Sequence, residues 1–69
     1  MKTTIQQTLA KNVRRARVEH GLSKVDFCLI ANISRPSLDA IEDGEGNIKL
    51  DTLCRLADAL QKQPWELLK

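Results

Sequence analysis

Apolar residues recur in this chain at helical spacing and never alternate over the length of a strand. A first apolar row runs along the N-terminal segment in steps of four, four and three residues, at Ile5, Leu9, Val13 and Ala16. A second row follows the same helical period near the C-terminus, at Leu53, Leu56, Ala57 and Leu60. Because β-branched residues are sparse and aromatic residues make up 3% of the chain, the sequence predicts an all-α fold.

Short polar residues mark where the helices between these two rows begin. Ser23 can act as an N-cap, and Asp26 three residues later supplies a capping-box-like acid. Ser34 can cap the next helix, and its hydroxyl must use the Ser37 amide because Pro36 has no N–H. Breaks between helices are predicted at Gly21, Asn32, Gly44 and Gly46. The sequence therefore predicts five helices, over 5–19, 24–31, 35–42, 50–60 and 64–68.

The length and the cysteine content exclude several classes of protein. With 69 residues the chain is long enough for one small domain, and we expect residues 1–69 to form it. Cys28 and Cys54 lack metal-site spacing, and His20 is their sole candidate co-ligand, so neither a metal nor another cofactor is predicted. The chain has one histidine and no Gly-rich phosphate loop, so the sequence offers few candidate catalytic groups. We therefore expect that the protein is not an enzyme. No apolar run reaches membrane-spanning length and Met1–Ala10 does not resemble a signal peptide, which predicts a cytoplasmic protein without a membrane partner.

Positive charge gathers in the first part of the chain, although the net charge of the whole is only +2. Residues 1–42 hold seven Lys/Arg against four Asp/Glu, whereas residues 43–69 hold four against five. The first part is therefore the better candidate for contact with an anionic partner. A solvated basic surface with no partner is the alternative reading of the same excess.

The segment 24–42 has the residue types that two short helices joined by a tight turn require. Cys28 is small enough to lie where the two helices cross, and Asn32 tolerates the positive φ that the turn needs. Apolar residues stand at the positions that must point inward, which are Phe27, Ala31, Ile33, Leu38 and Ile41. The segment is a predicted helix-turn-helix.

The run from Leu9 to Leu68 resembles the Cro and phage-repressor type of helix-turn-helix domain, also called the xenobiotic-response-element type. The matching stretches, in the order of that family, are VRRARVEHGLS, ISRPSLDAIEDG, LDTLCRLADAL and PWELL. The resemblance implies a compact five-helix, lambda-repressor-like DNA-binding domain. In such a domain the third helix, here 35–42, lies in the major groove of double-stranded DNA.

The resemblance also implies roles for residues at the start of that third helix. Ser34, Arg35 and Ser37 fall where the family meets base edges and nearby phosphates. The guanidinium of Arg35 can bond guanine O6 and N7 together, and a phosphate contact is the alternative role. Ala40 matches a base-reading position and could touch only a thymine methyl. Asp39 lies on the same side and would repel phosphate unless it accepts a hydrogen bond from cytosine N4.

Four further residues match positions that support the third helix or hold the DNA backbone. Lys24 opens the second helix and, with the amides of Ser23 and Lys24, is expected to hold a phosphate; a solvated lysine is the alternative. Arg17 and Glu42 match a pair that orients the third helix in relatives, and Arg17 would also lie near a phosphate. Two unpaired surface charges are the alternative for that pair.

Some residues point instead to a protein partner. Val25 and Leu29 are one helical turn apart, and if exposed they would offer an apolar patch. We expect the N-terminal segment with Ile5 to cover that patch. Trp65 either fills the core or joins a dimer contact. The candidate contact residues for a dimer or a protein partner are Trp65, Leu67, Leu68 and Leu29.

Together these patterns predict a dimeric, sequence-specific transcription regulator, most simply a bacterial or phage repressor that binds a palindromic operator and associates with the nucleoid. A restriction–modification controller is a variant of the same prediction. The alternative is a protein-interaction module, such as an antitoxin that neutralises a partner protein and binds DNA mainly in the complex. The acids at 43–45 and the Val25–Leu29 pair favour this alternative, whereas Lys24, Arg35 and Arg17 favour direct DNA binding.

Overall fold

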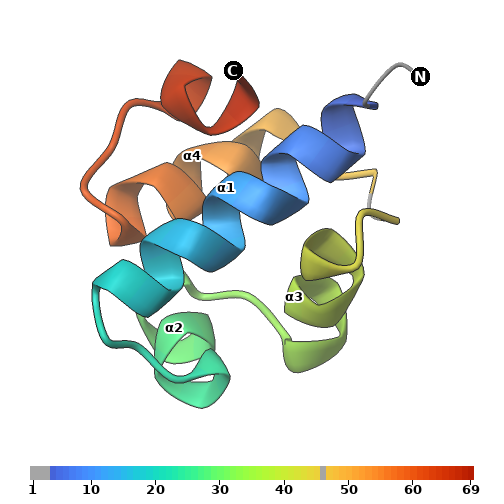
Figure 1. The fold of residues 1–69 in the computed structure, drawn as a ribbon. Coiled ribbons are helices and arrows are strands. Elements are labelled where there is room, and N and C mark those ends of the chain that lie inside the picture. The colour runs from blue at the N-terminus through green and yellow to red at the C-terminus, as the bar shows by residue number, and fades with distance from the viewer. Residues whose placement is uncertain (1–3, 46) are drawn as a thin grey trace.

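Four α-helices and one 3-10 helix make up the part of the chain that the computed structural model describes, residues 4–45 and 47–69 (Figure 1). In chain order they are α1 (Ile5–Glu19), α2 (Lys24–Ala31), α3 (Arg35–Glu42), α4 (Leu50–Ala59) and η1 (Pro64–Leu68). Strands are absent from these residues, as the all-α prediction requires. The predicted helix break at Gly46 lies outside the described residues. So do the first three residues of Met1–Ala10, the segment that does not resemble a signal peptide.

The predicted count of five helices is corrected to four α-helices and a 3-10 helix. The last element, η1, spans five residues, which is little more than one α-helical turn. At that length the tighter i→i+3 pattern is common, and the Glu66 amide bonds the Gln63 carbonyl at 3.0 Å. The other predicted bounds agree with the structure, except that α4 ends one residue earlier, at Ala59.

Local hydrogen bonds begin the helices where the sequence predicts. The Ser23 hydroxyl accepts from the Asp26 amide at 3.0 Å, and the Ser34 hydroxyl accepts from the Ser37 amide at 3.2 Å. Each cap satisfies an amide that has no partner within its helix, which is worth about 1 kcal/mol. The caps thereby fix where α2 and α3, the two helices of the helix-turn-helix, start.

The turn between α2 and α3 depends on a left-handed residue. Asn32 has φ 57° and ψ 52°, and its amide and that of Ile33 both return to the Cys28 carbonyl. From α4, the Arg55 guanidinium donates to the Asn32 carbonyl at 2.9 Å, so the turn is also held from outside. This confirms the prediction of positive φ at Asn32.

Replacing Asn32 by valine is expected to lower the free energy of unfolding by about 1–2 kcal/mol, because a β-branched side chain is strained at positive φ. Asn32 is exposed, so lost packing does not contribute. Asn32→Gly is the matched control and is expected to keep or slightly raise stability. Urea unfolding of the two variants checks this, and equal losses in both would contradict it.

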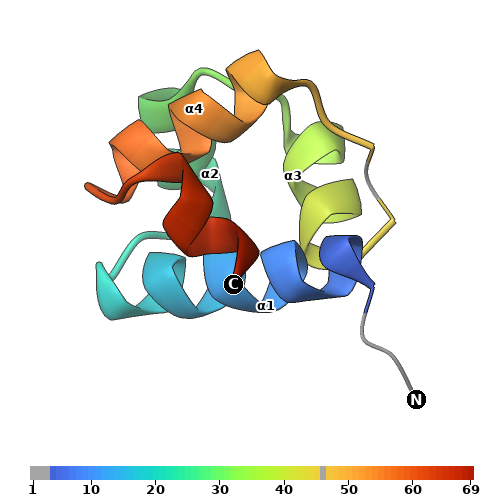
Figure 2. The same cartoon turned by 90° about the horizontal axis from the view of Figure 1, so that it is seen from above.

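The helices pack around one apolar cluster. α1 lies across α3 and η1, α2 packs on α3 and α4, and α4 also contacts η1 (Figures 1 and 2). Both apolar rows supply the core as predicted, with one exception. Ile5 is 54% exposed, because the first turn of α1 projects beyond the cluster. The described members of the core are Leu9, Val13, Ala16, Phe27, Cys28, Ala31, Leu38, Ile41, Leu53, Leu56, Ala57, Leu60 and Leu67.

Side chains of α1 hold the C-terminal part of the fold. The Asn12 amide group donates to the carbonyls of Leu67 and Lys69 at 2.9 and 3.0 Å. At the other end of α1, His20 Nε2 lies 3.0 Å from the Leu60 carbonyl, where α4 ends. These contacts join α1 to the last two elements. None of the described helices is long and apolar enough to cross a membrane.

Candidate nucleic-acid interface

The outer side of α3 is left polar by the way the helix packs. Leu38 and Ile41 point into the core and are 0% and 2% exposed. On the opposite side, Arg35 and Asp39 keep 47% and 45% of their side-chain surface exposed. Ala40 is half-buried between these two sides. The predicted base-reading residues Arg35 and Asp39 therefore share one accessible face.

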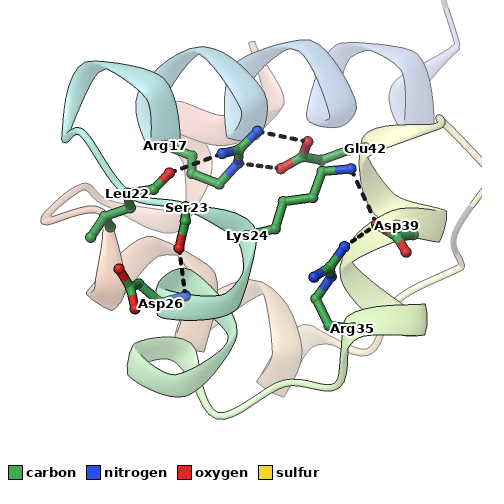
Figure 3. Close-up of polar contacts among 8 residues, drawn as sticks. All are labelled: Arg17, Leu22, Ser23, Lys24, Asp26, Arg35, Asp39 and Glu42. Atoms are coloured by element: carbon green, nitrogen blue, oxygen red, sulfur yellow. Dashed lines mark hydrogen bonds and ion pairs between the residues drawn. The ribbon is translucent and has the colours of Figure 1, made fainter.

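One carboxylate on this face binds two cations. Asp39 Oδ1 lies 3.2 Å from Lys24 Nζ at the start of α2 and 4.0 Å from Arg35 Nη2, one turn back on α3 (Figure 3). The Lys24 side chain is 39% exposed. From the sequence, all three residues are expected near DNA, but their binding to each other is not. We call these three residues the Asp39 bridge.

Arg17 and Glu42 form a nearly buried pair. Arg17 Nε donates to Glu42 Oε2 at 2.8 Å and Arg17 Nη2 to Glu42 Oε1 at 3.3 Å, in a two-pronged contact (Figure 3). Their side chains are 12% and 5% exposed. The remaining prong, Nη1, donates to the Leu22 carbonyl at 2.9 Å. A single guanidinium thus joins α1, the end of α3 and the segment before α2.

Hydroxyl groups lie at the starts of both helices of the helix-turn-helix. Ser34 donates its hydroxyl hydrogen to Ser37 Oγ at 2.8 Å while it accepts from the Ser37 amide. Ser37 therefore keeps its own hydroxyl hydrogen, and both serines are exposed. Ser23 is exposed as well and caps α2 beside Lys24. These are donors that a phosphate oxygen can accept from.

A second group of cations was missed by the sequence analysis. Lys11, Arg14 and Arg15 of α1 line an open groove with the end of α3, at Asp43 and Gly44. Among the described residues, none of these three cations has a carboxylate within ion-pair distance. Their spacing of three and four residues is a helical face, and that signal could have placed them. The groove also has three carboxylates in its lining, at Glu19, Glu42 and Asp43.

The predicted protein-contact residues divide into exposed and buried ones. Leu29 and Val25 are 76% and 54% exposed, so the expectation that Ile5 covers them is wrong. Ile5 starts α1 at the end far from α2 and instead lines a groove with Ile48, Leu50 and Leu68 (Figure 1). The patch on α2 is therefore open.

At the C-terminal end, Trp65 is 59% exposed, with Lys69 Nζ 4.9 Å from its ring centroid, so of the two alternatives for Trp65 the core is excluded. Leu67 is 1% exposed. It packs into the core and cannot be a partner contact, because the turn of η1 points it inward against α1 and α4. Leu68 is partly buried against the same core.

Cys28 lies where α2 and α3 meet and has no polar role. Burial raises the pKa of the Cys28 thiol; Arg35 lowers it, and Asp39 and Glu42 raise it further. The thiol is therefore neutral at physiological pH and acts as a small apolar residue, as predicted. Cys54 is exposed on α4.

The fold and this polar face define a class: an all-helical protein with a helix-turn-helix whose second helix is open to a partner. The chain belongs to the helix-turn-helix family HTH_3, whose sequence pattern matches residues 13–67. This family consists of DNA-binding transcription regulators of the xenobiotic-response-element type. Among curated proteins, no sequence matches the chain.

Solved structures agree with this assignment. The hypothetical transcription factor NHTF from Neisseria is 29% identical with a TM-score of 0.90, over 96% of this chain and 76% of that one. The restriction-modification controller protein C.AhdI from Aeromonas hydrophila is 27% identical with a TM-score of 0.84, over 90% of this chain and 94% of that one. The clp gene regulator ClgR from Corynebacterium glutamicum, 18% identical over 99% and 72%, shares the fold with a TM-score of 0.90.

Proposed function

We propose that this protein is a dimeric, sequence-specific repressor that reads a palindromic operator in double-stranded DNA through α3. The observation that carries the proposal is the exposed face of α3, on which Arg35 is 47% exposed while the Arg17–Glu42 pair fixes the helix to α1. A base-reading helix must be both accessible and held in a fixed orientation. Two copies would occlude a promoter by filling successive major grooves, with half-sites about 10 bp apart.

Lys24, Ser23, Ser34 and Ser37 are the proposed backbone contacts, whereas Arg17 is proposed to position α3, because its guanidinium nitrogens bind Glu42 and the Leu22 carbonyl. All four side chains lie at helix starts, where backbone amides without a partner inside the helix can also bind an anion. Arg35 is the proposed base-reading residue, and Ala40 the proposed contact to a thymine methyl. This division into positioning contacts and base contacts is the usual one at protein–DNA interfaces.

Dimerisation is supported by apolar surface near η1. Trp65 is 59% exposed, and Leu50 at the start of α4 is 80% exposed beside the groove that Ile5 and Leu68 line. A monomer gains by covering such side chains, and a twofold dimer does so with the same patch on each copy. The length match to C.AhdI, a restriction-modification controller protein, makes a controller of that kind a specific form of this proposal.

The test is selection of bound duplexes from a random DNA pool at physiological salt, with sedimentation of the free protein and of the complex. The expected result is a palindrome of two half-sites bound by two copies. A folded protein that enriches no sequence would refute a stand-alone regulator. A single enriched half-site bound by one copy would refute the dimer alone.

A second candidate function is a protein-interaction module, such as an antitoxin, that binds DNA mainly with its partner. The observation that favours it is the open patch on α2, where Leu29 is 76% and Val25 is 54% exposed. Leu29→Lys separates the two functions because it changes α2 on this patch and leaves α3 intact. Loss of partner capture with operator binding retained would assign the patch to a protein, and unchanged capture would reject this role.

Lys24→Ala is expected to weaken binding to the selected operator by about 1 kcal/mol and to reduce the slope of log K against log salt for that operator by about 0.9, the loss of one phosphate contact. Lys62→Ala, a cation between α4 and η1, is the matched control and should change neither quantity. Fluorescence anisotropy titrations over a salt series measure both. An unchanged salt slope on the operator would contradict the phosphate role.

A further inference from the structure

We propose that Asp39 sets the sequence specificity of this protein by restraining its own DNA-binding cations. In the free protein the Asp39 carboxylate binds Lys24 and Arg35. It releases these two cations at low cost only where a cytosine amino group donates a hydrogen bond to it in their place. The inference rests on the proposed function, since it assumes that α3 reads base pairs. It goes further by assigning to an acidic residue the rejection of incorrect DNA.

The geometry of the Asp39 bridge carries the inference. The same oxygen, Oδ1, lies 3.2 Å from Lys24 Nζ and 4.0 Å from Arg35 Nη2, so one carboxylate joins cations from two helices. Among the described residues, no other carboxylate lies within ion-pair distance of either cation. All three side chains are 39–47% exposed, which leaves them accessible to DNA while they bind each other. The carboxylate therefore stands where a phosphate or base acceptor would otherwise bind these cations.

Binding to a random sequence is unfavourable in this arrangement. A phosphate that takes Lys24 must displace Asp39, which leaves the carboxylate with the more distant Arg35 alone, 4.0 Å away, and close to a second anion. That carboxylate then recruits a cation from solution, which offsets part of the counterion release that drives binding to DNA. Asp39 thus lowers the affinity for DNA in general.

The cost is removed at a suitable base pair. Cytosine N4 donates a hydrogen bond in the major groove, and a carboxylate is the side chain that accepts it. Arg35 and Asp39 are four residues apart, about 6 Å along the axis of α3. Because base pairs are spaced about 3.4 Å apart, the guanine read by Arg35 and the cytosine read by Asp39 should lie within two base pairs of each other.

Asp39→Asn tests the inference, with Asp58→Asn as the matched control. Both changes remove one negative charge from an exposed side chain, but Asp58 lies on α4 and pairs with neither Lys24 nor Arg35. Asp39→Asn should bind random duplex about fivefold more tightly, with a salt slope steeper by about 0.9, while Asp58→Asn should match the native protein. Thermal unfolding of both variants confirms that each is folded.

Selection from a random pool supplies the second readout. The native protein should enrich two G·C base pairs no more than two base pairs apart, one whose guanine Arg35 reads and a second whose cytosine Asp39 reads. Asp39→Asn should keep the guanine and exchange the cytosine for adenine, because an amide side chain pairs with adenine N6 and N7. The ratio of operator affinity to random-duplex affinity should fall at least fivefold.

The outcomes separate this inference from the function on which it rests. If the native protein selects an operator but Asp39→Asn binds random duplex no more tightly than Asp58→Asn does, the inference is wrong and the function stands. An operator without a second G·C base pair within two base pairs of the one that Arg35 reads likewise overturns the inference alone. If the native protein enriches no sequence, both the inference about Asp39 and the proposed function are wrong.

Discussion

Replacing Glu42 by alanine is expected to lower the free energy of unfolding by about 3 kcal/mol. The Arg17 side chain is about 12% exposed in the native protein. Without the Glu42 carboxylate, its positive charge would therefore be largely buried and have no partner. A domain of this length has a total stability of roughly 3–10 kcal/mol, so the loss is at least about a third of the total. Urea denaturation monitored through Trp65 fluorescence and circular dichroism measures the loss.

The double variant Arg17→Met with Glu42→Leu separates the buried charge from the lost contact. Replacing both partners by apolar residues removes the unpaired charge, so stability should recover to within about 1 kcal/mol of the native value. DNA binding should not recover, because the two-pronged link between α1 and α3 is absent. A double variant as unstable as Glu42→Ala would show that packing, and not the unpaired charge, causes the loss. Full operator affinity in the double variant would show that the pair does not orient α3.

Arg35→Ala is expected to weaken binding to the selected operator by about 1–3 kcal/mol, roughly fivefold to 150-fold, with a much smaller effect on random duplex. The guanidinium offers two parallel donors that match guanine O6 and N7, and alanine leaves both acceptors unpaired. Arg35 is half exposed and its ion pair with Asp39 is long, at 4.0 Å, so stability should change by less than about 0.5 kcal/mol. Anisotropy titrations with operator and random duplex give the two affinities.

Arg35→Lys is the conservative control for this prediction. Lysine keeps the positive charge but cannot form the bidentate pair, so the variant should bind random duplex as the native protein does and still discriminate poorly at the guanine. If lysine restores operator affinity fully, Arg35 acts as a charge beside a phosphate. An equal loss on all duplexes for Arg35→Ala leads to the same conclusion.

Much of the fold could be predicted because helix starts and ends are matters of local chemistry. Ser23 and Ser34 cap helices through amides three residues away, and Asn32 adopts the left-handed turn that its side chain tolerates. The apolar rows placed the core because helical spacing alone decides which side chains share a face. There are two exceptions. Ile5 lies in the first turn of α1, where its surroundings and not the helical spacing decide its exposure. The last element, η1, is too short for its helix type to follow from the spacing of its apolar residues.

The candidate site was predicted in its parts but not in its connections. The sequence, through its family resemblance, paired Arg17 with Glu42 and put Lys24, Arg35 and Asp39 near DNA. It did not indicate that Asp39 binds both cations, because that contact joins α2 to α3 and depends on the angle at which the two helices cross. The exposed cations of α1 were missed for the same reason, since their groove exists only where α1 meets the end of α3.

The sequence by itself determined the helices, the turn and the family of this protein, because each follows from residues within a few positions of one another or from their order along the chain. The tertiary structure decided which surfaces are open. It buried Leu67, exposed Trp65 and Leu29, and tied the turn to Arg55 of α4. Those outcomes depend on contacts between residues far apart in the chain, and such contacts exist only once the helices have packed.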